Sequence, residues 1–143
     1  MENLKAIIVV YGTANTGETS SVKELVNLLG GSVQSRTADI LVPYKNNNVF
    51  VAYHGDSPAD VSRYINDFNK QENIDIMVCT TRTKGAGRTL LNNFVTQHST
   101  TKTLVVWFPK LAMANATDKK SQDIQNKKVA NEIKKMIDNA IKI

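Results

Sequence analysis

Residues 4–29, LKAIIVVYGTANTGETSSVKELVNLL, decide the fold of this chain. Residues 4–10 form a continuous, largely β-branched apolar run, which is typical of a strand buried on both faces. From residue 19 onward apolar residues recur at helical spacing, and the pair Gly30-Gly31 ends that pattern. A buried strand, a turn containing glycine and an amphipathic helix in direct succession predict the first unit of an α/β protein.

The remaining sequence continues the alternation of strands and helices. The apolar patterns predict strands at 38–44, 48–54, 74–80 and 101–108, and helices at 19–29, 56–68, 87–97 and 121–143. Helices that join parallel strands cover both faces of a sheet. We therefore expect a single three-layer α/β/α domain over residues 1–143, with a mainly parallel five-stranded sheet that includes one antiparallel edge hairpin.

The predicted hairpin turns at the sequence KNNN, residues 45–48, where asparagines tolerate a positive φ. Pro43 places the first hairpin strand at a sheet edge, because proline cannot donate to a second neighbour. Ser57 is a candidate cap for the following helix, and Pro58 suits its first position.

The composition is that of a globular domain, with 41% hydrophobic and 22% charged residues in a chain of 143. The single cysteine, Cys79, excludes an internal disulfide and favours a reducing compartment. The N-terminal residues do not resemble a signal peptide, so we expect a cytoplasmic protein. No apolar run approaches the ~18 residues of a membrane span, so we expect no membrane partner.

Positive charge is concentrated in the middle of the chain. Residues 76–117 contain five Lys or Arg and no Asp or Glu, within a chain of net charge +5. A segment of this kind favours an anionic partner. Nucleic-acid binding through residues 82–110 is one interpretation, and a nucleotide or phosphate anion is another.

The turn between the first strand and first helix has the spacing Gly12-x-x-x-x-Gly17-x-Thr19. Glycines allow the backbone amides of such a turn to converge, and the helix that follows directs its positive dipole end toward the same point. A hydroxyl at the position of Thr19 can bind a Mg²⁺ ion that is coordinated by phosphates. The position of this turn, after a buried strand and before a helix, is the context that the motif requires.

On Gly12, Gly17 and Thr19 the chain resembles the P-loop NTPases, in particular small bacterial ATP-binding proteins. The similarity extends to YHGDSPADV (53–61) and MVCTTRTKGAGRTLL (77–91), and covers roughly residues 4–108. It implies binding of ATP or another nucleotide with Mg²⁺, and activity as an NTPase or small kinase. The implied phosphate-binding residues are Gly12, Thr13, Ala14, Asn15, Thr16, Gly17, Glu18, Thr19 and Ser20.

Glu18 departs from the family pattern, because the family has a lysine at this position that contacts the phosphates. Two unit charges ~4 Å apart interact by about 4 kcal/mol at an effective dielectric constant near 20. Three hypotheses follow. Glu18 turns away and pairs with a basic residue of the 82–88 segment, or it serves as an additional metal ligand. Alternatively, the protein is a catalytically inactive relative that acts as a regulatory or interaction protein.

Asp56 and Arg82 are the candidate catalytic residues. P-loop proteins commonly carry an acidic residue after a strand beside the first one, and the resemblance implies that Asp56, with Thr19, holds the metal. Capping of the next helix is the alternative role for Asp56. Arg82 follows a buried strand and is placed to neutralise phosphate charge. Asp60 is interpreted as a charge in the first turn of a helix.

Further basic and aromatic residues follow the predicted strands. Lys84 and Arg88 are candidate anion contacts, and an arginine at a helix N-terminus indicates an anionic partner. Lys110 is a candidate replacement for the missing loop lysine. Trp107 and Phe108 are interpreted as core residues, and His54 and His98 as structural residues without metal-ligand spacing.

Overall fold

The computed structural model describes residues 4–12, 18–33, 38–110 and 119–142. Within these residues the chain forms β1 (Ala6–Gly12), α1 (Glu18–Leu28), β2 (Asp39–Tyr44), β3 (Asn47–Ala52), α2 (Pro58–Lys70), β4 (Ile76–Arg82), α3 (Ala86–His98), β5 (Leu104–Pro109) and α4 (Lys119–Ile141). Each predicted strand and helix is present, with bounds that lie within a few residues of the prediction.

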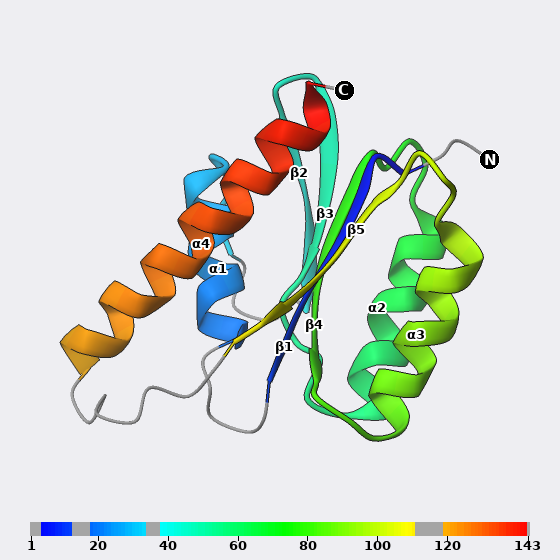
Figure 1. The fold of residues 1–143 in the computed structure, drawn as a ribbon, viewed down its shortest axis with the longest axis horizontal. Coiled ribbons are helices and arrows are strands. Elements are labelled where there is room, and N and C mark those ends of the chain that lie inside the picture. Colours follow the sequence, from blue (N-terminus) through cyan, green and yellow to red (C-terminus); the bar gives the residue numbers. More distant parts are fainter. Residues whose placement is uncertain (1–3, 13–17, 34–37, 111–118, 143) are drawn as a thin grey trace.

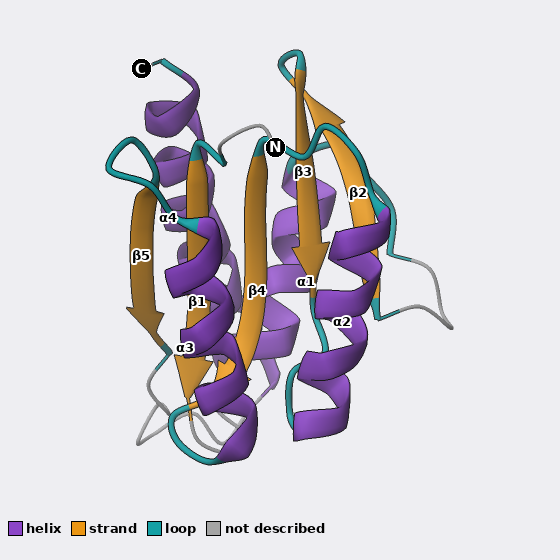
Figure 2. Ribbon diagram, turned by 90° about the vertical axis from the view of Figure 1, so that its right-hand side faces the viewer, coloured by secondary structure: helices purple, strands orange, loops and turns teal. Residues whose placement is uncertain are grey.

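The strands form one five-stranded sheet in the order β2-β3-β4-β1-β5 (Figure 2). The β2–β3 pair is antiparallel, whereas β3–β4, β4–β1 and β1–β5 are parallel. The carboxyl ends of the four parallel strands therefore share one edge of the sheet, at the bottom of Figure 2. The predicted fold class, a mainly parallel α/β sheet with an antiparallel edge hairpin, is confirmed.

Helices cover both faces of the sheet and create two separate cores (Figure 1). α1 and α4 pack on one face, where Val22, Leu25 and Ile133 are fully buried. α2 and α3 pack on the other face around Tyr64 and Leu91. Central strands bury side chains on both faces, which explains why their sequences are continuous apolar runs rather than alternating ones.

The β2–β3 hairpin confirms the predicted edge and corrects the predicted turn. Pro43 is exposed on the outermost strand, β2. An edge strand tolerates proline, because no second neighbouring strand needs the N–H that proline lacks. The positive φ values belong to Lys45 (48°) and Asn46 (64°), so only one of the three asparagines supplies the expected conformation. The next one, Asn47, is buried instead, and its side chain bonds to Lys5 Nζ and the Lys45 carbonyl.

Asp39, at the start of β2, makes the stability of the folded protein depend on pH. Its Oδ2 atom is buried and has no hydrogen-bond partner in the part of the chain that the structure describes. Burial raises the pKa of Asp39 from 3.8 to about 7; the nearby Asp67 carboxylate contributes to this rise, whereas Arg63 opposes it. Between pH ~4 and 7 the folded protein therefore holds a proton that the unfolded chain has released. This linkage makes the folded state less stable as the pH rises through that interval.

We expect Asp39→Asn to stabilise the protein at pH 8 and to have much less effect at pH 5. The wild type loses stability as the buried Asp39 ionises above pH 5. The amide of the variant cannot ionise, so the variant keeps that stability. Urea unfolding at the two pH values measures this difference, with the exposed Asp123→Asn as a control. Equal effects of Asp39→Asn at pH 5 and pH 8 would show that Asp39 titrates normally.

Candidate anion-binding site at the carboxyl edge of the sheet

The carboxyl ends of β1 and β4 meet at a topological switch point. Gly12 is the register partner of Arg82, and the Thr83 N–H donates to the Gly12 carbonyl at 3.2 Å. The chain leaves β1 toward α1 on one face of the sheet, and leaves β4 toward α3 on the other face (Figures 1 and 2). In open α/β sheets, ligands bind in the crevice that such diverging connections create.

Arg82 is the basic residue next to the start of the 12–19 turn. Alternate residues of β4, including Ile76 and Val78, belong to the core beneath α1 and α4, so Arg82 projects toward the face that carries α1. Its Nε lies 3.5 Å from Asp56 Oδ1. The Arg82 side chain is 34% exposed and that of Asp56 is 54% exposed, so both groups remain open to a ligand.

Asp56 is positioned by close packing rather than by helix capping. The Ser57 side chain caps α2 by accepting from the Asp60 N–H at 3.1 Å, as predicted, so the capping role considered for Asp56 is wrong. Gly55 packs against the Thr80 carbonyl so closely that an added Cβ would lie 1.9 Å from that oxygen. Asp60 pairs with Arg63 at 2.8 Å, which confirms it as a charge in the first helical turn.

The strand that leads to Asp56 is not the neighbour of β1 that the resemblance implied. β3 pairs with β4, and β4 separates β3 from β1. Asp56 therefore reaches the switch point across the end of β4, through its ion pair with Arg82. The expectation that the hairpin strand lies directly beside the first strand is wrong, although the two candidate catalytic side chains do lie together.

Arg88 is held on an aromatic platform that the sequence analysis did not identify. Its guanidinium carbon lies 4.2 Å from the Trp107 ring centroid and 4.8 Å from that of Tyr11. Within the described part of the chain, its N–H groups donate to the Thr83 carbonyl and to Asn92 Oδ1. Trp107 was predicted to be a core residue. It packs against the core but is only half-buried, and its ring also contacts the Arg88 guanidinium. Cation–π contacts of this kind orient a guanidinium without neutralising it.

The N-terminus of α3 adds further positive character to this edge. Gly85 precedes the helix with φ 110° and provides no capping side chain, and the first turn contains no acidic residue. The first amides of a helix have no partner within the helix, so they favour an anion. Lys84 lies exposed just before this turn.

Lys110 follows β5 at the same edge, but it is buried rather than open to a ligand. Only 4% of the residue is exposed, and its backbone N–H donates to the Tyr11 carbonyl at 2.7 Å.

Two buried hydroxyls lie one and two positions before Arg82 in β4. The Oγ1 atoms of Thr80 and Thr81 have no hydrogen-bond partner among the described residues.

The turn itself is defined by its ends. β1 ends at Gly12 and α1 begins at Glu18, as the motif predicted. The predicted phosphate-binding residues 13–17 lie outside the described residues, as do the side chains of Glu18 and Thr19. Ser20 is exposed in the first turn of α1, and Ser21 is buried, where its hydroxyl lies 3.1 Å from Asn126 Oδ1 of α4.

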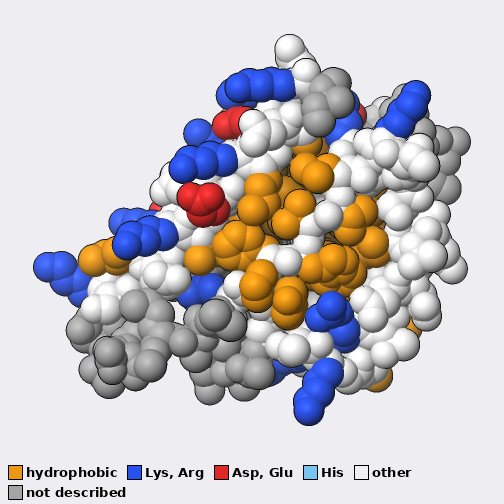
Figure 3. All heavy atoms as spheres, viewed as in Figure 1, with side chains coloured by type: hydrophobic (Ala, Val, Ile, Leu, Met, Phe, Trp, Pro, Cys, Tyr) orange, Lys and Arg blue, Asp and Glu red, His pale blue; other side chains and the backbone are white. Residues whose placement is uncertain are grey.

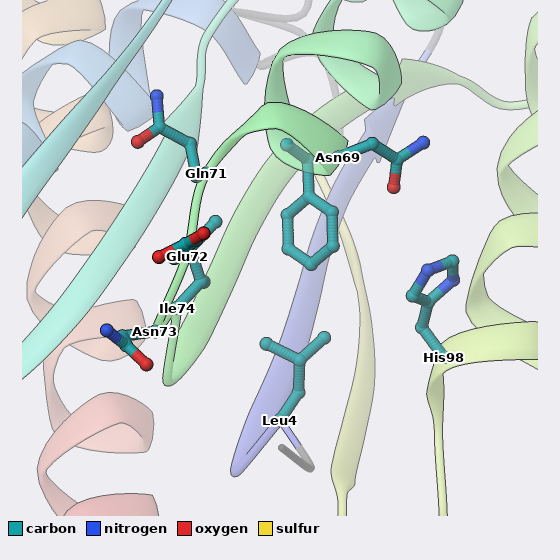
Figure 4. A pocket seen from close by; sticks show the side chains of 8 residues that line it. Leu4, Asn69, Gln71, Glu72, Asn73, Ile74 and His98 are labelled. Carbon is teal, nitrogen blue, oxygen red and sulfur yellow. The ribbon is translucent and has the colours of Figure 1, made fainter. Parts of the chain in front are cut away.

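Two surface depressions lie at the opposite, amino-terminal edge of the sheet. The first has a volume of about 440 Å³ and is lined by Leu4, Phe68, Asn69, Gln71, Glu72, Asn73, Ile74 and His98 (Figure 4). The second, about 710 Å³, lies beside the start of β5.

His98 stacks on Phe94 with a centroid distance of 4.1 Å, and its Nδ1 lies 3.0 Å from the Phe94 carbonyl, so its predicted structural role is confirmed.

The two histidines and the cysteine do not form a metal centre in the described residues. Within residues 4–12, 18–33, 38–110 and 119–142, no three His, Cys, Asp or Glu side chains are clustered to hold a metal ion. Burial, followed by the charge of Lys23, lowers the pKa of His54. Burial raises the pKa of the Cys79 thiol to about 12, which makes it unreactive.

The chain matches no protein-family model, no curated protein and no solved structure. In the part of the chain that the structure describes, no helix has the length and apolar character needed to cross a bilayer.

Proposed function

We propose that the protein binds a nucleotide, with ATP as the first candidate, through its phosphates at the carboxyl edge of β1 and β4. This proposal rests mainly on the pairing of Gly12 with Arg82 at the switch point, with five residues between Gly12 and the start of α1 at Glu18. The strand and the helix that the motif requires therefore lie in the required order along the chain. Arg82 and the N-termini of α1 and α3 supply positive charge for the phosphates.

Mg²⁺ is compatible with the groups at this edge. This ion typically uses one or two protein carboxylates together with water and substrate phosphates. Asp56 supplies such a carboxylate and is 54% exposed, and Thr19 is the hydroxyl that the motif assigns to the same ion. When bound, the ion would neutralise phosphate charge. Asp56 and Arg82 would then be released from each other to contact the metal and the phosphates.

Phosphoryl transfer or nucleotide hydrolysis is the activity that this assignment predicts. Arg82 would stabilise the negative charge that develops on the transferred phosphoryl group, and Asp56 would organise the metal or the attacking group. An inactive relative with a regulatory or interaction role is the main alternative. Glu18 favours that alternative, because the sequence has a glutamate at the position of the family's lysine.

Nucleic-acid binding through residues 82–110 receives less support from the arrangement of the basic residues. Arg82 and Arg88 lie at the carboxyl edge, whereas Lys102 lies in the turn before β5 at the opposite edge. Lys110 is buried, and Arg88 lies over two aromatic rings. These residues do not form one continuous exposed basic surface of the kind that follows a phosphate backbone.

We expect Mg-ATP to raise the melting temperature of the protein, and Arg82→Gln to weaken this binding about tenfold. A tenfold change corresponds to about 1.4 kcal/mol, a modest value for removing one charged phosphate contact. Arg63→Gln is the matched control, because it breaks the other Arg–Asp pair, on α2, with the same change in charge. Thermal shift with Mg-ATP, Mg-GTP and inorganic phosphate provides the measurement. Equal losses in the two variants would indicate a general charge effect rather than a site at Arg82.

A further inference from the structure

Among the residues that the structure describes, β5 is an edge strand that carries no charged side chain. It pairs with β1 on one side, and its other side forms the end of the sheet. Its sequence, LVVWFP, contains no charged residue. Soluble proteins normally protect such an edge with charged side chains, bulges or a covering segment. An edge of six uncharged, apolar residues therefore indicates a surface that another strand covers.

The side chains of β5 form an apolar patch on the surface (Figure 3). Leu104 is 38% exposed, and Val105, Val106, Trp107 and Phe108 are each half-buried although they lie in a strand of the main sheet. Figure 3 shows exposed apolar side chains gathered in the region where β5 crosses the front of the molecule in Figure 1. We refer to residues 104–109 with their outward side as the β5 edge.

The backbone groups that point outward from β5 can be identified from its pairing with β1. The N–H groups of Leu104 and Lys110 donate to β1, at the carbonyls of Lys5 and Tyr11. Because backbone groups alternate along a strand, the N–H groups of Val105 and Trp107 point outward. The outward row ends at Pro109, which has no N–H, and at Thr103, whose N–H already donates to the Thr100 carbonyl at 3.0 Å.

We propose that two copies of this chain pair through their β5 edges, antiparallel and about a two-fold axis at Val106. In this register Val105 of each copy lies opposite Trp107 of the other. The two such pairs form four hydrogen bonds, which use all the outward N–H groups identified above. The same register places Leu104 opposite Phe108 and Val106 opposite its own copy, so every cross-strand pair is apolar. A second copy thus complements this edge in both hydrogen bonding and side-chain character.

The size of the β5 edge determines the expected strength of the dimer. Six residues span roughly 20 Å at about 3.3 Å per residue. Such pairing buries around 1,000 Å² in total, at the low end of specific interfaces. Each copy carries a net charge of +5, so the copies repel each other at low salt. The dimer is therefore weak and reversible, and salt strengthens it by screening this repulsion.

Sedimentation equilibrium from about 10 μM to 1 mM, at low and at moderate NaCl concentration, tests this proposal. The expected result is a monomer–dimer equilibrium that tightens as salt is added. Leu104→Lys should weaken association at least tenfold, because it places a charge in the apolar pairing surface. Ile124→Lys is the matched control, since Ile124 is an exposed apolar residue on α4 (49% exposed), and it should change association less than threefold.

Amide hydrogen exchange in the same concentration range identifies the interface. The Val105 and Trp107 amides should gain protection as the dimer forms, whereas those of Val106 and Phe108 should change little because they already donate to β1. A wild-type protein that remains monomeric at 1 mM would overturn the proposal. So would a dimer that Leu104→Lys and Ile124→Lys weaken equally, or one in which the Val105 and Trp107 amides gain no protection.

Discussion

Replacement of Gly55 by alanine is expected to destabilise the fold by about 4 kcal/mol, within the range that marks an exceptional point mutation. The added Cβ would lie 1.9 Å from the Thr80 carbonyl oxygen and 2.6 Å from its carbon. These are backbone atoms of β4 in the centre of the sheet, and the Tyr64 hydroxyl also donates to the same oxygen at 3.0 Å. Neither the strand nor the turn can move without breaking other contacts.

Thermal unfolding measures this effect, and a fall in melting temperature of about 10 °C or more is expected for a chain of this size. Gly85→Ala is the informative control. Gly85 has φ 110°, and apart from its own chain neighbours no described residue comes within 4 Å of the added Cβ. That variant therefore carries backbone strain of about 1–3 kcal/mol without a clash. A Gly55→Ala protein that is as stable as the wild type would show that the 54–56 turn is not packed on β4.

Glu18→Lys is expected to increase the affinity for Mg-ATP at least tenfold. The substitution replaces a carboxylate by an ammonium group at the first residue of α1, and so converts repulsion of the phosphates into attraction. Each charge contributes about 4 kcal/mol at ~4 Å and an effective dielectric constant near 20, and tenfold corresponds to only about 1.4 kcal/mol. The expected increase is therefore a conservative fraction of the electrostatic change.

Isothermal titration with Mg-ATP at constant salt measures the gain, and Glu24→Lys provides the matched control. Glu24 lies in the same helix and the substitution changes the net charge equally. An equal gain in both variants would indicate an effect of overall charge. Binding by Glu18→Lys alone, with none by the wild type, would identify this chain as an inactive relative and favour the regulatory alternative.

The fold could be predicted from the sequence because local patterns and long-range packing agree in this chain. The run at 4–10 is apolar on both faces, as a central strand must be, and β1 is buried by helices on each side. Ser57 and Pro58 specify the start of α2 through chemistry that depends only on neighbouring residues. Strand order depends instead on contacts between distant segments, and so the position of β4 between β3 and β1 was not predicted.

The sequence predicted only those residues of the candidate site whose position depends on the end of a single strand. Arg82 is the last residue of β4 and Asp56 follows β3, so both lie at the shared carboxyl edge, where they pair at 3.5 Å. The platform beneath Arg88 depends on the register of β1 with β5, which places Tyr11 and Trp107 near each other with ring centroids 6.4 Å apart. Aromatic residues near the ends of two predicted strands were the available signal, but only that register makes them neighbours.

The most direct test of the proposed nucleotide site is an NMR titration of backbone amides with Mg-ATP. We expect saturable shifts of the Gly12, Glu18 and Thr19 amides and of the amides in the Arg82–Lys84 segment, with weaker effects of inorganic phosphate at the same amides. Shifts confined to the depression lined by Leu4 and His98 at the opposite edge, or no saturable shifts at all, would contradict it.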